Sequence, residues 1–258
     1  MTHAGHNPAL SDLRRRVVAL DRAARASRPA LAFGVEAVDN HLPWGGLPLG
    51  RLHEIVESGV DSEHAAAATL FTAGILARTR GTVLWCLRGR DLFAPALAGV
   101  GLHPDRVIYV ETWKDSEVLP AMEEGLRHGG LGGVVGEVGR LGLTASRRLQ
   151  LAAEGSGVPA FLVRRWRTDA ERASASEPTA AFTRWRIAPA PSRAPPAPGL
   201  GRAVWRVDLL RCRGAESRHW VLEACDAQGR LAVPALPPDR SAPQEVVRPL
   251  RARRRAAA

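Results

Sequence analysis

From residue 31 to residue 167 the chain alternates short apolar runs with longer stretches of helical periodicity. The apolar runs predict strands, and the periodic stretches predict the helices that connect them. Strands joined through helices form right-handed crossovers, which give a parallel sheet covered on both faces. We therefore expect an α/β fold of three layers with a mostly parallel central sheet. The predicted strands are Arg51–Glu57, Thr82–Leu87, Arg106–Val110, Gly133–Val138 and Ala160–Trp166, and the predicted helices are Ser62–Arg80, Asp91–Gly99, Ser116–His128 and Thr144–Glu154.

The sequence changes character after the fifth predicted strand. Thr168–Ala181 is small and polar, which predicts a flexible loop. Thr183–Ala188 alternates apolar and arginine positions as a strand does, whereas Pro189–Gly201 contains five prolines and predicts a stiff excursion instead of a strand. Arg202–Arg213 and Arg218–Asp226 then predict two further strands joined by a turn. We expect these C-terminal extension strands to join the sheet in antiparallel orientation.

Both ends of the chain differ from this core. Residues 9–26 repeat apolar side chains at helical spacing, among them Leu13, Val17 and Leu20, which predicts an amphipathic helix. Its apolar seam fits a partner protein and the body of this chain equally well. Residues 234–258 are rich in proline and then in arginine, which predicts a disordered basic tail. The predicted organisation is an N-terminal helix in 1–28, a core in 29–232 with a proline-rich excursion at 189–201, and a tail in 233–258.

Charge is segregated along the 258 residues, whose formal net charge is +10. Residues 1–30 have a net charge of +4, residues 31–163 of −4, and residues 164–258 of +10. Basic flanks suit nucleic acid or an acidic protein face. The sequence shows no apolar run long enough to span a membrane and no secretory signal, and its three cysteines match no metal or disulfide spacing. We therefore expect a cytoplasmic protein with reduced thiols and no membrane contact.

The loop between the first core strand and its helix lies where α/β proteins place a phosphate loop. Such a loop needs several glycines and a lysine, but this one has a single glycine, no lysine and several acids. A carboxylate about 4 Å from a phosphate charge is repelled by roughly 4 kcal/mol at an effective dielectric near 20. We expect a degenerate loop with no nucleotide cofactor, no metal and no catalytic residue, and we interpret Glu137, at the tip of the fourth strand, as a vestigial acid. The loop residues in question are Glu57, Ser58, Gly59, Asp61, Ser62 and Glu63.

Arginine and tryptophan alternate in several of the predicted strands. Arginines along a backbone track beside stacking aromatic rings are typical of proteins that grip single-stranded nucleic acid. Alternation also places Trp185 and Ile187 on one face and the arginines on the other, so a core tryptophan with solvated arginines explains the pattern as well. The candidate residues for nucleic acid or an acidic partner are Arg164, Arg165, Arg167, Arg184, Arg186, Arg251, Arg253, Arg254 and Arg255.

The stretch Leu31–Ile55 resembles the start of the core in RecA-like recombinases, through Gly34, Asp39, the run Gly45-Gly46-Leu47-Pro48, and Glu54-Ile55. More narrowly, the chain is similar to the ImuA family, RecA-like accessory proteins of bacterial damage-induced mutagenesis. The stretches that carry this resemblance are Asp39–Ile55, Gly133–Val138, Ser146–Arg167, Phe182–Ser192 and Trp205–Gly214. The resemblance implies a RecA-like fold for the core.

The resemblance also implies partners. These are an inactive polymerase homologue of the ImuB kind, an error-prone replicative-type DNA polymerase, and RecA as a further candidate, with any DNA contact indirect. This sequence departs from the recombinases because Arg90 stands about where they carry a water-activating glutamate, and an arginine does not act as a base. We therefore favour a non-catalytic scaffold of a translesion DNA synthesis complex formed in the SOS response. The alternatives are a DNA-dependent ATPase with an unconventional pocket and a cell-division inhibitor of the SulA type.

Overall fold

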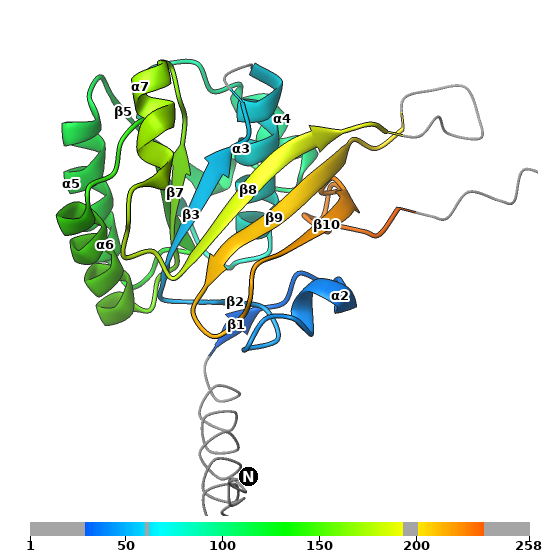
Figure 1. The fold of residues 1–258 in the computed structure, drawn as a ribbon. Helices are drawn as coiled ribbons and strands as arrows, with labels where there is room; N and C mark the ends of the chain where they lie inside the picture. The colour runs from blue at the N-terminus through cyan, green and yellow to red at the C-terminus, as the bar shows by residue number, and fades with distance from the viewer. Residues whose placement is uncertain (1–28, 60–61, 193–200, 235–258) are drawn as a thin grey trace, which may run out of the picture.

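The computed structural model describes residues 29–59, 62–192 and 201–234. An eight-stranded sheet of order β10-β9-β8-β3-β7-β6-β4-β5 runs through the molecule (Figure 1). Strands β3 to β8 pair in parallel where they are neighbours, whereas β9 and β10 are antiparallel. These strands are β3 (Leu52–Glu57), β4 (Val83–Arg88), β5 (Val107–Thr112), β6 (Gly133–Val138), β7 (Ala160–Arg164), β8 (Thr183–Ala190), β9 (Val204–Cys212) and β10 (Arg218–Glu223).

Helices cover both faces of the parallel part of the sheet. One face packs against α3 and α4, and the other packs against α5 and α6. A small two-stranded sheet and a short helix precede β3. The bounds are β1 (Ala30–Leu31), α2 (Glu36–Asp39), β2 (Leu47–Pro48), α3 (Ser62–Ala77), α4 (Ala94–Gly99), η1 (Pro104–Arg106), α5 (Asp115–Leu126), α6 (Leu143–Ser156), α7 (Asp169–Ala173) and η2 (Ser174–Ser176).

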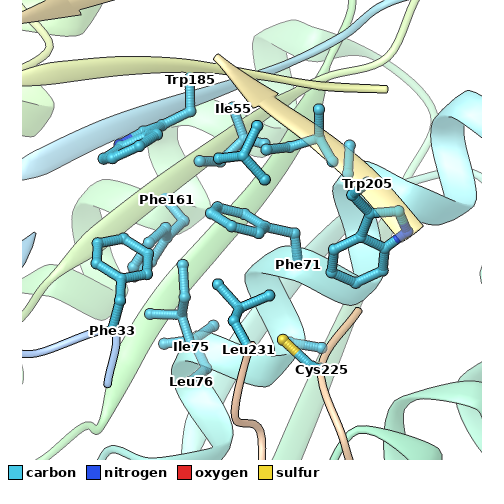
Figure 2. Close-up of a cluster of buried hydrophobic side chains, with 14 of the residues drawn as sticks. Phe33, Ile55, Phe71, Ile75, Leu76, Phe161, Trp185, Trp205, Cys225 and Leu231 are labelled. Atoms are coloured by element: carbon cyan, nitrogen blue, oxygen red, sulfur yellow. The ribbon is translucent and has the colours of Figure 1, made fainter. Parts of the chain in front are cut away.

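The larger core lies between α3 and the sheet, and its aromatic rings come from distant parts of the chain. Phe71 of α3 packs at its centre, with Phe33, Trp185 and Trp205 around it (Figure 2). Helix α3 suits this position because its sequence is rich in alanine and apolar on nearly all sides. Since β8 and β9 extend the sheet beside β3, a single helix covers strands from both halves of the chain.

The sequence predicted this α/β class and the antiparallel extension, and both predictions are confirmed. Two local predictions were wrong. Thr168–Ala181 is not an unstructured loop, because α7 and η2 form within it and the Thr168 hydroxyl accepts a hydrogen bond from the Glu171 N–H at 3.2 Å. Strand β8 continues through Pro189, which pairs with β9 alone, since the pairing with β3 ends at Ile187 and no neighbour needs the missing N–H.

The two faces of the extension strands carry different kinds of side chain. Trp185, Trp205 and Trp220 are buried on the α3 side, in the larger core. Arg184, Arg186 and Arg206, which are next to Trp185 and Trp205 in the sequence, point to the opposite face, whereas Arg218 of β10 lies over the ring of Trp220. Of the two interpretations of the arginine–tryptophan pattern, the core tryptophan is therefore correct for β8, β9 and β10, and these indoles are not placed to stack on bases.

Candidate functional site

Three acids and one arginine meet at the carboxyl edge of the sheet, where α/β proteins place their ligand sites. Glu57 ends β3, Glu137 lies near the end of β6, and Asp91 follows β4. Arg165 directly follows β7, the strand between β3 and β6. Its Nη1 lies 2.8 Å from Glu137 Oε2 and 3.0 Å from Asp91 Oδ1, and its Nε lies 3.4 Å from Glu57 Oε1. We call these four side chains the carboxyl-edge cluster.

The two glutamates of this cluster are almost fully buried, and each has a second partner. The indole N–H of Trp85 donates to Glu137 Oε1 at 2.9 Å, so both oxygens of Glu137 are bonded within the protein. The backbone N–H of Trp166 donates to Glu57 Oε2 at 3.4 Å. Neither carboxylate is therefore placed to hold a metal ion, and no group of three or more ligating side chains suited to a metal occurs among the described residues.

Burial and the nearby opposite charges shift the pKa values of Glu57 and Arg165 in opposite directions. Desolvation raises the pKa of Glu57 from its ordinary value of 4.5 to about 7, and the nearby Glu137 carboxylate adds to the shift while Arg165 opposes it. Burial disfavours the charge on Arg165, but contact with Glu137, Asp91 and Glu57 raises its pKa overall. The guanidinium therefore stays charged, and it is the counter-ion that makes the buried acids tolerable.

The described residues at the two ends of the loop after β3 contact each other. Ser58 Oγ and His64 Nδ1 form a hydrogen bond of 2.6 Å. The His64 ring lies against Gly59, where an added Cβ would come 2.4 Å from its Cδ2. Asp61 lies outside the described residues, and the side chains of Ser62 and Glu63 are not described either.

Of the five arginines assigned from the sequence to a binding surface that the structure describes, three are engaged inside the protein. Arg164 is fully buried and donates to Glu54 Oε1 at 2.9 Å, which corrects its assignment to a surface. Arg184 is held by the same carboxylate at 2.8 Å and is nearly buried, and Arg165 belongs to the carboxyl-edge cluster. Their positions follow from the strands, because consecutive side chains on β7 point to opposite faces.

The remaining assigned residues divide into exposed and undescribed positions. Arg167 is about half exposed and binds Asp91 Oδ2 at 3.0 Å, and Arg186 remains partly exposed on β8. Leu13, Val17, Leu20, Arg251, Arg253, Arg254 and Arg255 lie outside the described residues.

Sequence reasoning missed Arg88, which ends β4 and joins three elements. It binds Asp115 at the start of α5 at 3.2 Å and Glu171 of α7 at 2.6 Å. Arg90, which stands where recombinases carry a glutamate, is instead exposed and pairs with Glu111 at 2.5 Å. An arginine at the end of an apolar strand was the available signal for Arg88. Without the strand order, however, the sequence does not indicate which carboxylates Arg88 contacts.

Comparison with known structures places this architecture in the RecA-like class. A crystal structure of the RadB recombinase superposes with a TM-score of 0.51, covering 80% of this chain and all of that chain at 16% identity. Protein ImuA from two strains of Caulobacter vibrioides, NA1000 / CB15N and ATCC 19089 / CB 15, is 40% identical over 217 residues, which is 81% of this chain and 88% of theirs. The chain therefore belongs to the ImuA family. No family model matches it.

Replacing Arg165 should destabilise the protein far more than replacing an exposed arginine. In Arg165→Gln the buried carboxylates of Glu57 and Glu137 lose their counter-ion, and we expect the free energy of unfolding to fall by about 3–5 kcal/mol at pH 8. Urea denaturation followed by circular dichroism measures this change. The matched control is Arg90→Gln, which breaks an exposed ion pair and should cost at most about 1 kcal/mol. Equal effects of the two substitutions would contradict the role given to the cluster.

The raised pKa of Glu57 predicts a specific pH dependence. Because the folded state holds this proton more tightly than the unfolded state, the contribution of Glu57 to the free energy of unfolding should fall as the pH rises from about 4.5 to about 7. The buried His53, whose pKa is lowered to about 4, contributes in the opposite direction, so the prediction concerns the difference between the variant and the wild type. Glu57→Gln removes this titration, so the variant should gain about 2 kcal/mol relative to wild type between pH 5 and pH 8. Urea titrations at both pH values test this, and a difference that does not vary with pH would argue against a protonated Glu57.

Proposed function

We propose that this chain is a non-catalytic RecA-like accessory protein of damage-induced mutagenesis, which helps to assemble an error-prone translesion DNA synthesis complex in the SOS response. Membership of the ImuA family supports the role in mutagenesis. The observation that supports the non-catalytic part is the position of Arg165, whose guanidinium lies between Glu57 and Glu137 at the edge where this fold class binds ligands.

Nucleotide hydrolysis makes chemical demands that this edge does not meet. A P-loop enzyme uses a lysine on the phosphates and an acid that holds Mg²⁺. The loop Glu57–His64 contains no lysine, and Glu137 is neutralised by Arg165 and bonded to Trp85. Retention of the fold without its chemistry is physically reasonable, since a fold can serve as a scaffold for other contacts.

The proposed partners are an ImuB-like polymerase homologue, an error-prone replicative-type polymerase and RecA, and the proposed location is the cytoplasm. In the described part of the chain, no helix has the length and apolar character needed to cross a bilayer. The candidate partner segments are residues 1–28 and 241–258, which both lie outside the described residues. Both are basic, and the first carries the apolar seam of Leu13, Val17 and Leu20.

Nucleotide binding tests the non-catalytic part of the proposal. We expect isothermal calorimetry of the full chain with Mg-ATP to show no saturable heat, because the loop after β3 contains no lysine and the acids are paired with Arg165. Saturable binding, with turnover that Glu137→Gln abolishes, would establish the ATPase alternative in its place.

Partner binding tests the scaffolding part. Deleting residues 1–28 or residues 241–258 should weaken binding of the ImuB-like homologue by about tenfold or more, which corresponds to about 1.4 kcal/mol. Surface plasmon resonance with the immobilised homologue measures this. A full-length control in which the arginines of 241–258 become glutamine separates charge from length. Unchanged affinity in both deletions would remove these segments as the partner surfaces.

A further inference from the structure

The outer face of β8, β9 and β10 carries an arginine pair that the proposed function does not use. Helices α5 and α6 cover the opposite end of this side of the sheet (Figure 1). On the same side the short helix η2 lies next to Arg184 of β8, whose Nη1 donates to the Ala175 carbonyl at 3.1 Å, whereas Arg186 and Arg206 remain partly exposed. The face around Arg186 and Arg206 is therefore an open surface of the sheet, with its tryptophans turned inward toward α3.

Arg186 of β8 and Arg206 of β9 are held together by one buried carboxylate. Asp208 Oδ2 accepts hydrogen bonds from Arg186 Nη2 at 2.6 Å and from its Nε at 2.9 Å, and Asp208 Oδ1 accepts one from Arg206 Nε at 2.8 Å. The side chain of Asp208 is 7% exposed, whereas those of Arg186 and Arg206 are 44% and 52% exposed. Burial opposes the charge on Asp208, but its bonds to the two arginines hold its pKa below the ordinary value.

This arrangement fixes two guanidiniums while leaving part of each available. A guanidinium has five N–H donors in a rigid fork, and Asp208 uses two of them on Arg186 and one on Arg206. The remaining donors include exposed ones, and the pair with its acid has a net charge of +1. Because Asp208 holds both side chains, an anion that bridges them needs to order little further protein structure.

The surroundings add positive charge to the same face. Next to the pair, the buried Glu54 is bonded to Arg164 and Arg184, and Arg211 donates to nearby backbone carbonyls. On this side of the sheet lie five arginines and two buried carboxylates, and one of the arginines, Arg164, is itself fully buried. These residues are Arg164, Arg184, Arg186, Arg206 and Arg211, with Glu54 and Asp208. Glu223 of β10 alternates onto the same face and is paired with Arg202 at 3.1 Å.

The charge of the chain's own flanks identifies the kind of occupant. Residues 1–28 and residues 235–258 each carry six arginines and two acids, so neither flank is complementary to a positive face. A protein partner would need apolar anchors, and on this face the large exposed apolar side chains are Val221 and Leu210. An anionic polymer held chiefly through its charge fits better, and phosphate accepts hydrogen bonds from two guanidiniums at once.

We propose that the outer face of β8–β10 binds single-stranded DNA, with a backbone phosphate bridging Arg186 and Arg206. Val221 lies opposite Arg206 and His219 opposite Asp208 in the strand pairing, so they flank the phosphate site and can contact sugar and base. A flexible single strand can follow a twisted sheet, whereas duplex binding rests on a longer track of phosphate contacts than two exposed arginines supply. This inference does not depend on the scaffolding role.

The test is fluorescence anisotropy of a labelled oligo-dT of about 30 nucleotides, titrated with the full chain over a series of salt concentrations. Arg186→Gln with Arg206→Gln should lower the affinity about tenfold and reduce the magnitude of the salt slope by about 0.7, the value for one phosphate contact on a single strand. The matched control is Arg127→Gln with Arg148→Gln. These two arginines also share one carboxylate, Glu123, and are as exposed, but Glu124 makes their cluster neutral.

A second variant guards against misfolding, because the double substitution leaves Asp208 buried without a counter-ion. Adding Asp208→Asn removes that charge and should show the same loss of affinity with wild-type circular dichroism. Arg186→Lys with Arg206→Lys, which keeps the charge but loses the fork, should give an intermediate affinity. The proposal is overturned if the glutamine variants bind like the Arg127/Arg148 control. It is equally overturned if duplex DNA binds as tightly as the single strand, or if poly-glutamate displaces oligo-dT as effectively per charge as unlabelled oligo-dT.

Discussion

The guanidinium of Arg165 contacts carboxylates that reach it from β3, from β6 and from the loop after β4. Buried acids need a counter-charge, and Arg165 supplies it from the end of β7, the strand that lies between the strands of the two glutamates. The carboxyl edge of a parallel sheet is where this class of fold makes its ligand site. Here the guanidinium of Arg165 lies at that edge among three acids, and Trp85 donates to one of them, Glu137, so the ion pairs and this hydrogen bond form one connected set of contacts.

Arginines also neutralise buried carboxylates on the other side of the sheet. Arg164 neutralises Glu54, and Arg186 with Arg206 neutralises Asp208, each through a carboxylate that is almost fully buried. These clusters use arginine throughout, and a planar fork with several donors satisfies a buried carboxylate better than an ammonium does. The difference between them lies in exposure. In the carboxyl-edge cluster the arginine is 18% exposed, whereas the two arginines around Asp208 are 44% and 52% exposed, and this contrast is the basis for proposing a binding role for the second pair alone.

Sequence reasoning named some of the residues of the carboxyl-edge cluster and missed their contacts. It placed Glu57 and Glu137 at the carboxyl edge and recognised a loop without lysine, because both statements depend on local sequence and on the polarity of parallel strands. It grouped Arg164, Arg165 and Arg167 as one basic surface because they are neighbours in the chain. In the structure, Arg164 lies on the α6 side of the sheet and contacts Glu54. Arg165 lies on the α3 side, in the carboxyl-edge cluster, because successive side chains on a strand point to opposite faces.

The sequence by itself determined most strands and helices of the core, the antiparallel extension and the absence of a lysine from the loop after the first core strand, because each depends on periodicity or residue type within a short window. The tertiary structure alone decided which charges meet. Glu54 and Arg164 are 110 positions apart, and Arg165 meets its acids only because β7 lies between β3 and β6. Strand order is a property of the whole chain, set by how the helices and the long crossovers pack, and no local pattern encodes it.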